Sequence, residues 1–308
     1  MTGYLYATSV EEAIGYLEEY DGGAQIIAGG TDLMPDIREQ RRNPHCLVDI
    51  TRIPGLDQIQ VVGDVVQVGA AVTFAFIKEF PFIQQHVHAL AQAARSLGAV
   101  QIQTAATLVG NIVQSMPAAD GAIVSVALDA EARIVSRDAD TWRPVESLFE
   151  GPGVSAIDPS HEMITHIRFR SPSRACGTAW SRIGRRDSLV LPILNCAVRL
   201  CLQDEGSQIE RAAIALGPVA PRPYRARQAE AFLRGRRPDV EVFAQAGVIV
   251  RQESNPRSSP ARASREYRLS VIPVMVKDTL VAAARRAGAQ AGSDDDAVNA
   301  GEGQAVEL

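Results

Sequence analysis

Residues 24–35, AQIIAGGTDLMP, end a short apolar run in two adjacent glycines and continue into a segment with helical spacing. The apolar run predicts a buried strand, and the glycines predict a tight turn between that strand and a helix. Glycine has no Cβ, so its backbone can adopt a positive φ and can bring its N–H group close to a ligand. The pair therefore favours either a plain tight turn or a loop that cradles a phosphate group.

A second stretch, TLVGN at residues 107–111, joins a hydroxyl side chain, a glycine and an amide within five positions. Two such loops can face one pyrophosphate and donate to both phosphates without adding positive charge, which suits an acidic chain. Neither loop has the G-x-G-x-x-G spacing of the doubly wound dinucleotide fold. The segment EGPGVSA at 150–156 shares those letters only, and we expect it to be a turn.

The first half of the chain mixes predicted helices and strands, which indicates an α+β fold. Ser9 and Glu12 have the spacing of a capping box at the start of an amphipathic helix. Further strands and helices are predicted from the apolar periodicity, with strands within 46–53 and 64–72, a helix over 82–99, and a helix passing into a strand over 122–136.

Turn residues at 169–180 predict a linker, after which a second unit begins. Its pattern predicts two neighbouring strands and then three helices, at 191–203, 209–220, 225–235, 239–252 and 271–287. The last segment is rich in Gly, Ala and acids, so we expect a disordered acidic tail. The predicted boundaries are 1–174 for the first domain, 175–287 for the second and 288–308 for the tail.

Charge and hydropathy exclude two classes of partner. A net charge of -5 and a pI of about 5.6 argue against a nucleic-acid surface, which needs clustered and unbalanced Lys and Arg. No apolar stretch reaches the roughly 18–20 residues of a membrane span, and the N-terminus lacks the layout of a signal peptide. We therefore expect a cytoplasmic protein.

The cysteines have no metal-site spacing and are expected to be reduced, mostly buried thiols; they are Cys46, Cys176, Cys196 and Cys201. His86 and His88 would point to different faces of a helix, so they are not expected to share a metal. The sequence predicts no metal site.

Eight segments, in this order, resemble the FAD-binding medium subunits of the molybdenum hydroxylases: AGGTDLMP, LVDITRIPGL, VGAAVTFAFI, TAATLVGNIVQSMPAAD, LFEGPG, SRIGRRDSL, ALGPVAPRP and SREYRLSV. That family includes xanthine dehydrogenase, carbon monoxide dehydrogenase and 4-hydroxybenzoyl-CoA reductase. The resemblance extends to about residue 285. It implies a two-part FAD-binding domain of the vanillyl-alcohol-oxidase (PCMH) type, followed by a smaller α/β C-terminal domain.

The resemblance also implies which residues bind FAD. The pyrophosphate would be lined through backbone N–H groups and one hydroxyl by Ala28, Gly29, Gly30, Thr31, Asp32 and Leu33. The facing loop would consist of Thr107, Gly110 and Asn111. The family's second loop usually has T-x-G-G-N, and here Val109 replaces the first glycine, so a Cβ restricts φ and crowds the phosphate.

Three further residues are assigned by the same resemblance. Asp120 would accept hydrogen bonds from flavin hydroxyls, Thr73 would lie near the cofactor, and Arg182 would lie near the isoalloxazine. For Asp120 the alternative is a helix N-cap, and for Arg182 it is a solvated or intersubunit charge.

The implied function is that of a FAD-carrying electron-transfer subunit of a multi-subunit molybdenum hydroxylase. Its partners would be a small [2Fe-2S] subunit and a large molybdopterin subunit, in a heterotrimer or a dimer of heterotrimers. No cysteine lies between Cys46 and Cys176, which argues against the cluster-bearing insertion of some relatives. The alternatives are a self-sufficient flavin oxidase with its own substrate, and a FAD-free scaffold, for which Val109 is the only indication.

Overall fold

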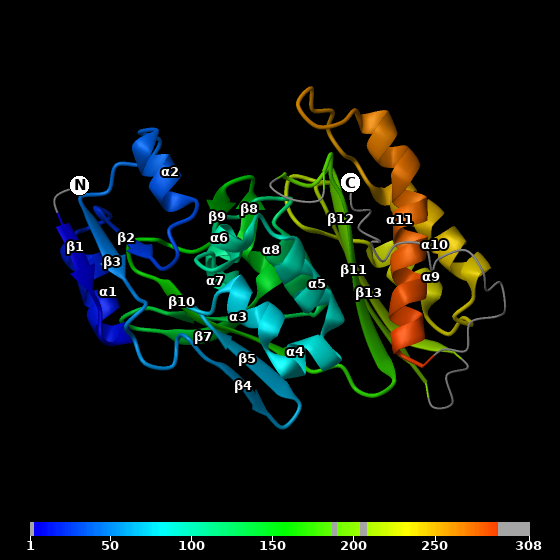
Figure 1. The fold of residues 1–308 in the computed structure, drawn as a ribbon, viewed down its shortest axis with the longest axis horizontal. Coiled ribbons are helices and arrows are strands. Elements are labelled where there is room, and N and C mark those ends of the chain that lie inside the picture. The colour runs from blue at the N-terminus through cyan, green and yellow to red at the C-terminus, as the bar shows by residue number, and fades with distance from the viewer. Residues whose placement is uncertain (1–2, 187–189, 204–207, 289–308) are drawn as a thin grey trace, which may run out of the picture.

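The computed structural model describes residues 3–186, 190–203 and 208–288. Figure 1 shows the three larger sheets in succession along the longest axis of the molecule, from the first strands, in blue, to the C-terminal helices, in yellow and orange; a fourth sheet has two short strands. Helices and strands mix throughout, so the α+β prediction is confirmed.

The first sheet is parallel and has the strand order β1-β3-β2. Its elements are β1 (Gly3–Tyr6), α1 (Val10–Glu19), β2 (Ala24–Ile27), α2 (Leu33–Arg38) and β3 (Cys46–Asp49). Ser9 caps α1 as predicted, because its Oγ accepts from the Glu12 N–H at 3.1 Å. The Glu12 carboxylate accepts from the backbone N–H of Thr8 at 2.6 Å, one residue before the expected partner.

The second sheet is antiparallel and has the order β4-β5-β10-β6-β7. Its strands are β4 (Ile59–Val62), β5 (Val65–Gly69), β6 (Glu131–Val135), β7 (Asp140–Pro144) and β10 (Met163–Arg170). The accompanying elements are α3 (Phe74–Glu79), α4 (Pro81–His86), α5 (His88–Ser96), α6 (Val100–Gln103), α7 (Leu108–Val113), α8 (Asp120–Ala127), η1 (Val145–Leu148), β8 (Phe149–Gly151) and β9 (Val154–Ser155).

The helix predicted over 82–99 is divided into α4 and α5 at Val87, whose ψ of 58° is not helical. Beyond the break, the Ala89 N–H donates to Thr178 Oγ1 of the third sheet at 3.1 Å. A contact with a segment 89 residues away thus accompanies the break, and the local apolar spacing could not predict it.

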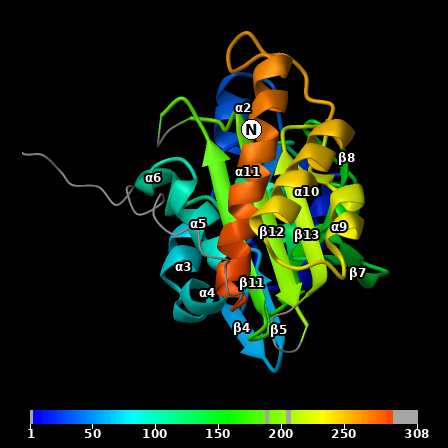
Figure 2. The same cartoon turned by 90° about the vertical axis from the view of Figure 1, so that its right-hand side faces the viewer.

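The third sheet is antiparallel, with the order β11-β12-β13-β14. Its elements are β11 (Cys176–Ile183), β12 (Leu194–Leu202), β13 (Ile209–Gly217), β14 (Tyr224–Arg225), α9 (Arg227–Leu233), α10 (Val240–Glu253) and α11 (Arg265–Arg286). Helices α9 to α11 cover one face of this sheet, and α5 and α8 lie on the other (Figures 1 and 2). Helix α11 begins six residues before the predicted start, because Ser264 caps it by accepting from the Tyr267 N–H.

Two hydrophobic cores underlie this arrangement. One lies under the first two sheets and the other lies between the third sheet and helices α9 to α11. Trp180, Ala197 and Ala215 of the third sheet pack into the first core, so the two units share an apolar interface. The domain boundary at 174/175 stays a prediction, and the tail predicted at 288–308 lies, beyond Gly288, outside the described residues.

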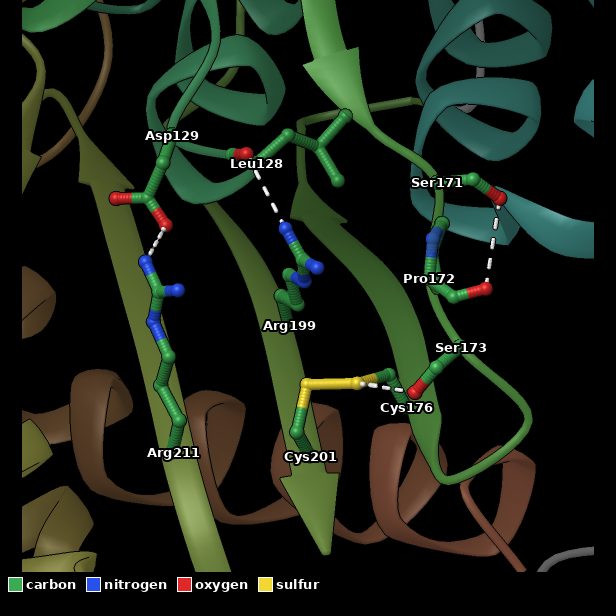
Figure 3. Close-up of a disulfide and its surroundings, with 9 residues drawn as sticks. All are labelled: Leu128, Asp129, Ser171, Pro172, Ser173, Cys176, Arg199, Cys201 and Arg211. Carbon is green, nitrogen blue, oxygen red and sulfur yellow. Dashed lines mark hydrogen bonds and ion pairs between the residues drawn. A yellow bond between two sulfur atoms is a disulfide. The ribbon is translucent and has the colours of Figure 1, made fainter. Parts of the chain in front are cut away.

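The expectation of four reduced thiols is wrong for two of them. Cys176 and Cys201 lie directly opposite each other on β11 and β12, and their sulfurs form a disulfide (Figure 3). Pairing on adjacent strands brings the two Cα atoms to 4.0 Å, within reach of a bridge. Cys46 and Cys196 are free and buried, as expected.

Candidate functional site

A cavity of about 780 Å³ lies between the glycine loop after β2, the segments around α7 and α8, and the β11–β12 region of the second unit. Its volume falls in the range of small-molecule and cofactor sites. Eleven of the twelve predicted site residues line it: Ala28, Gly29, Gly30, Thr31, Asp32, Leu33, Thr107, Gly110, Asn111, Asp120 and Arg182. The twelfth, Thr73, does not.

The two positions of the first loop require glycine for different structural reasons. Gly30 has a φ of +64°, a left-handed conformation that disfavours residues with a Cβ. A Cβ on Gly29 would lie 1.8 Å from the carbonyl oxygen of Ala105, so this glycine lets the first loop touch the segment that leads into α7. One glycine therefore shapes the turn, and the other brings the two loops together.

The backbone of the first loop has unused hydrogen-bond donors. From Gly29 to Leu33, no main-chain N–H donates to any atom of the described residues. The loop runs into the first turn of α2, where the Leu33 N–H has no acceptor among the described residues, while the Met34 N–H donates to the Gly30 carbonyl at 2.9 Å. This stretch of the cavity wall can therefore donate to an anionic group.

In the second loop, the predicted side chains form hydrogen bonds within the protein. Thr107 Oγ1 accepts from the Gly110 N–H at 3.0 Å and caps α7. Asn111 Oδ1 accepts from the Ala122 N–H at 3.2 Å and so joins α7 to α8. Thr73 caps α3 through the Phe76 N–H at 3.2 Å, and its backbone pairs with Thr107 in an isolated bridge. Thr73 thus lies behind the loop.

Val109, the departure from the family's glycine pattern, is a helical residue of α7 and is only 6% exposed. Its backbone has no positive φ, so the restriction imposed by its Cβ carries no conformational cost here. The side chain contributes to the apolar core and to the cavity wall.

Asp120 is the first residue of α8 and is 5% exposed. The N-cap of α8 is Ala119, without any side-chain cap, so the N-cap alternative for Asp120 is wrong. Burial raises the pKa of the Asp120 carboxyl to about 6, against the opposing effects of the Arg182 charge and a hydrogen bond from Asn195. Asp120 thus titrates near neutrality while facing the cavity.

Arg182 reaches the cavity from β11. Its Nη1 donates to the carbonyl oxygen of Ser96 at 2.5 Å, and its Nη2 donates to that of Val190. Its Nε is buried and has no partner among the described residues. Arg182 is therefore not a solvated surface charge. Arg182 and Asp120 both line the cavity, and the positive charge of Arg182 lowers the pKa of Asp120.

Several lining residues were not predicted. Gly153, Val154 and Ser155, in the turn and strand after β8, border the cavity, although EGPGVSA was expected to be only a turn. Arg42 Nη2 donates to Gln114 Oε1 at 3.3 Å, linking the segment after α2 to the end of α7. The sequence signal for Gly153, Val154 and Ser155 was the segment LFEGPG, residues 148–153, which ends at Gly153 and belongs to the segments that resemble the family.

Comparison with known proteins agrees with this arrangement. Residues 1–171 match the family described as "FAD binding domain in molybdopterin dehydrogenase", and residues 180–283 match the "CO dehydrogenase flavoprotein C-terminal domain". The chain belongs to this family of FAD-binding subunits. It is an oxidoreductase subunit of the xanthine and carbon monoxide dehydrogenase type, and its cofactor is FAD.

The relatives in this family match the chain over most of its length. The nicotinate dehydrogenase FAD-subunit of Eubacterium barkeri is 31% identical over 74% of this chain and 77% of its own. The xanthine dehydrogenase FAD-binding subunit of Escherichia coli O157:H7 is 29% identical over 92% of this chain and 97% of its own. A solved structure of carbon monoxide dehydrogenase from Hydrogenophaga pseudoflava is 27% identical and covers 92% and 97% of the two chains, with a TM-score of 0.86.

The cavity fits the cofactor of the family. FAD combines an anionic pyrophosphate with polar hydroxyls and a large apolar ring system, and the wall offers unused backbone donors, a carboxyl and mostly apolar side chains. Within the described ranges, no helix is long and apolar enough to span a bilayer, and no group of three or more His, Cys, Asp or Glu could hold a metal ion.

Proposed function

We propose that the chain carries electrons between the [2Fe-2S] clusters of a small partner subunit and an external acceptor, within a complex that also contains a large molybdopterin subunit. The proposal is supported by the composite cavity, which has the donors for FAD, together with relatives named as FAD-binding subunits or medium chains. We expect a heterotrimer or a dimer of heterotrimers. Bound FAD would supply the redox chemistry.

The chain's own residues would bind and tune the cofactor. The N–H groups of the loop at 28–33 would hold the pyrophosphate, with the second loop at 107–111 behind it. Asp120 would accept hydrogen bonds from cofactor hydroxyls, and the Arg182 guanidinium would stabilise negative charge on the flavin. Thr73 would act indirectly, by pairing with Thr107.

The test uses the purified full-length chain, first alone and then with its small and large subunits. We expect the isolated chain to bind FAD and to contain no stoichiometric iron or molybdenum. It should oxidise no organic substrate until the partners are added. Substrate turnover by the isolated chain, or stoichiometric iron or molybdenum in it, would overturn the electron-transfer proposal and favour a self-sufficient flavin oxidase.

A further inference from the structure

Asn195 contacts the cavity wall from behind. It is the second residue of β12, is fully buried and does not itself line the cavity. Its Nδ2 donates to Asp120 Oδ1 at 2.7 Å and to the carbonyl oxygen of Ala118 at 3.1 Å. Both acceptor residues line the cavity, so one amide group of the second unit fixes two adjacent points of the wall.

The orientation of this amide is set by the charge it faces. Asn195 Oδ1 is buried and has no partner among the described residues, which is unfavourable for a buried acceptor. It points toward Gly217, where an added Cβ would lie only 2.8 Å away. Turning the amide over would place this oxygen against the Asp120 carboxylate and would lose both donated bonds. The observed arrangement is therefore the one that an ionised Asp120 favours.

We propose that Asn195 is a positioning residue for FAD binding, which holds the Asp120 side chain on the cavity wall as an ionised acceptor. Packing of β12 against α8 would then set how tightly the first unit holds its cofactor. The inference rests on the role proposed above for Asp120.

Two groups oppose the effect of burial on Asp120, namely Asn195 and Arg182. The other charged residues on the elements packed against α8 are His88 and Arg95 on α5, Glu146 on η1, Arg199 on β12, Glu210 and Arg211 on β13, and Arg225 on β14. The shift in the Asp120 pKa comes from burial, Arg182 and Asn195, and not from these residues. Removing the Asn195 amide leaves Arg182 alone, so Asp120 should take up a proton at a higher pH.

The experiment is a titration of FAD into the full-length apoprotein between about pH 5 and 9, followed by fluorescence quenching. The variants are Asn195→Ala, Asp120→Asn and the double substitution. Wild-type affinity should fall as the pH falls through about 6. Asn195→Ala should weaken FAD binding about tenfold at neutral pH, as expected for one hydrogen bond to a charged group. It should also raise the midpoint, which is the pH at which the affinity for FAD has fallen halfway. Asp120→Asn should weaken binding and flatten the profile.

The double variant decides between positioning and a merely structural role. If Asn195 acts through Asp120, Asn195→Ala should change affinity less than about twofold in the Asp120→Asn background. An equal loss in both backgrounds would overturn the inference. If Asp120→Asn leaves affinity and profile unchanged, the proposed role of Asp120 itself fails.

The matched control is Ser125→Ala. Ser125 is also buried in α8, where its Oγ donates to the Gly121 carbonyl at 2.8 Å, but it lies off the cavity. Ser125→Ala should not move the pH midpoint of FAD affinity, and a rise like that expected for Asn195→Ala would overturn the inference.

A second variant is used if Asn195→Ala fails to fold by circular dichroism. Asn195→Asp keeps the size of the side chain and places a second carboxyl beside Asp120. That variant should raise the midpoint. An unchanged midpoint in Asn195→Asp would contradict the proposal.

Discussion

Arg225 of the second unit and Asp129 of the first lie 2.7 Å apart, Nη1 to Oδ1, just beyond the C-terminal end of α8. The same Nη1 donates to the Val126 carbonyl of α8 at 3.0 Å. Arg211 also pairs with Asp129, and Arg199 donates to the Leu128 carbonyl (Figure 3). Arginines from three strands thus meet the end of α8 where the helix dipole is negative.

We expect Arg225→Met to lower the free energy of unfolding by about 3–5 kcal/mol, since the substitution leaves buried acceptors without their partner. The Arg225 side chain is only 3% exposed and also pairs with Glu230 at 2.6 Å. Urea denaturation measures the loss. Arg227→Met is the control, because its pair with Glu146 is exposed and should be worth less than about 1 kcal/mol. Equal losses in the two variants would contradict the expectation.

The glycine loop can be tested with two glycines of the same conformation. Gly30 and Gly63 have φ values of +64° and +61°, so alanine at either position should cost about 1–2 kcal/mol of stability. Only Gly30→Ala should also weaken FAD binding, because Gly63 lies in the turn between β4 and β5, away from the cavity. Calorimetric titration with FAD distinguishes them. Unchanged affinity in a folded Gly30→Ala protein would rule out the loop as a phosphate site.

The disulfide closes a loop of 25 residues, so its removal should lower stability by roughly 3 kcal/mol. The double variant Cys176→Ala/Cys201→Ala should show this loss in thermal unfolding, and a reductant should then have no further effect. FAD affinity should stay unchanged, because Cys176 begins β11 and Arg182 lies six residues along it. A reductant that fails to destabilise the wild-type protein would show that the bridge does not form in solution.

The stability of the apoprotein should depend on the protonation of Asp120. The pKa is raised to about 6 on folding, so the folded state binds the proton more tightly than the unfolded chain. This contribution is present below about pH 4 and is lost as the pH rises through about 6. The change that Asp120→Asn makes in the free energy of unfolding of the apoprotein should therefore be more stabilising at pH 8 than at pH 4, by on the order of 2 kcal/mol. Identical pH slopes in variant and wild type would disprove this.

Much of the fold could be predicted from local signals in the sequence. The cap at Ser9, the glycine turn and the paired strands β12 and β13 follow from spacing between near neighbours, and the structure has all three. The order of the segments identified the family and with it eleven of the residues that line the cavity. Local patterns are sufficient where the interacting residues are close in sequence.

The features that were missed depend on long-range contacts. Cys176 meets Cys201 only because of the register of two strands, and Gly29 is needed only because Ala105 lies against it. Asn195 reaches Asp120 across 75 residues, once the third sheet packs on α8. None of these distances can be obtained from periodicity or composition.

Helix α8 is held at both of its ends, by Asn195 near Asp120 and by the arginines beyond Ala127. It therefore acts as a spacer of fixed length. Inserting or deleting one residue would displace one end by about 1.5 Å and rotate it by about 100° relative to the other, so both sets of contacts could not be kept. Substitutions along the helix should be tolerated more readily than a change in the number of its residues, and natural variation in length should fall in the loops on either side.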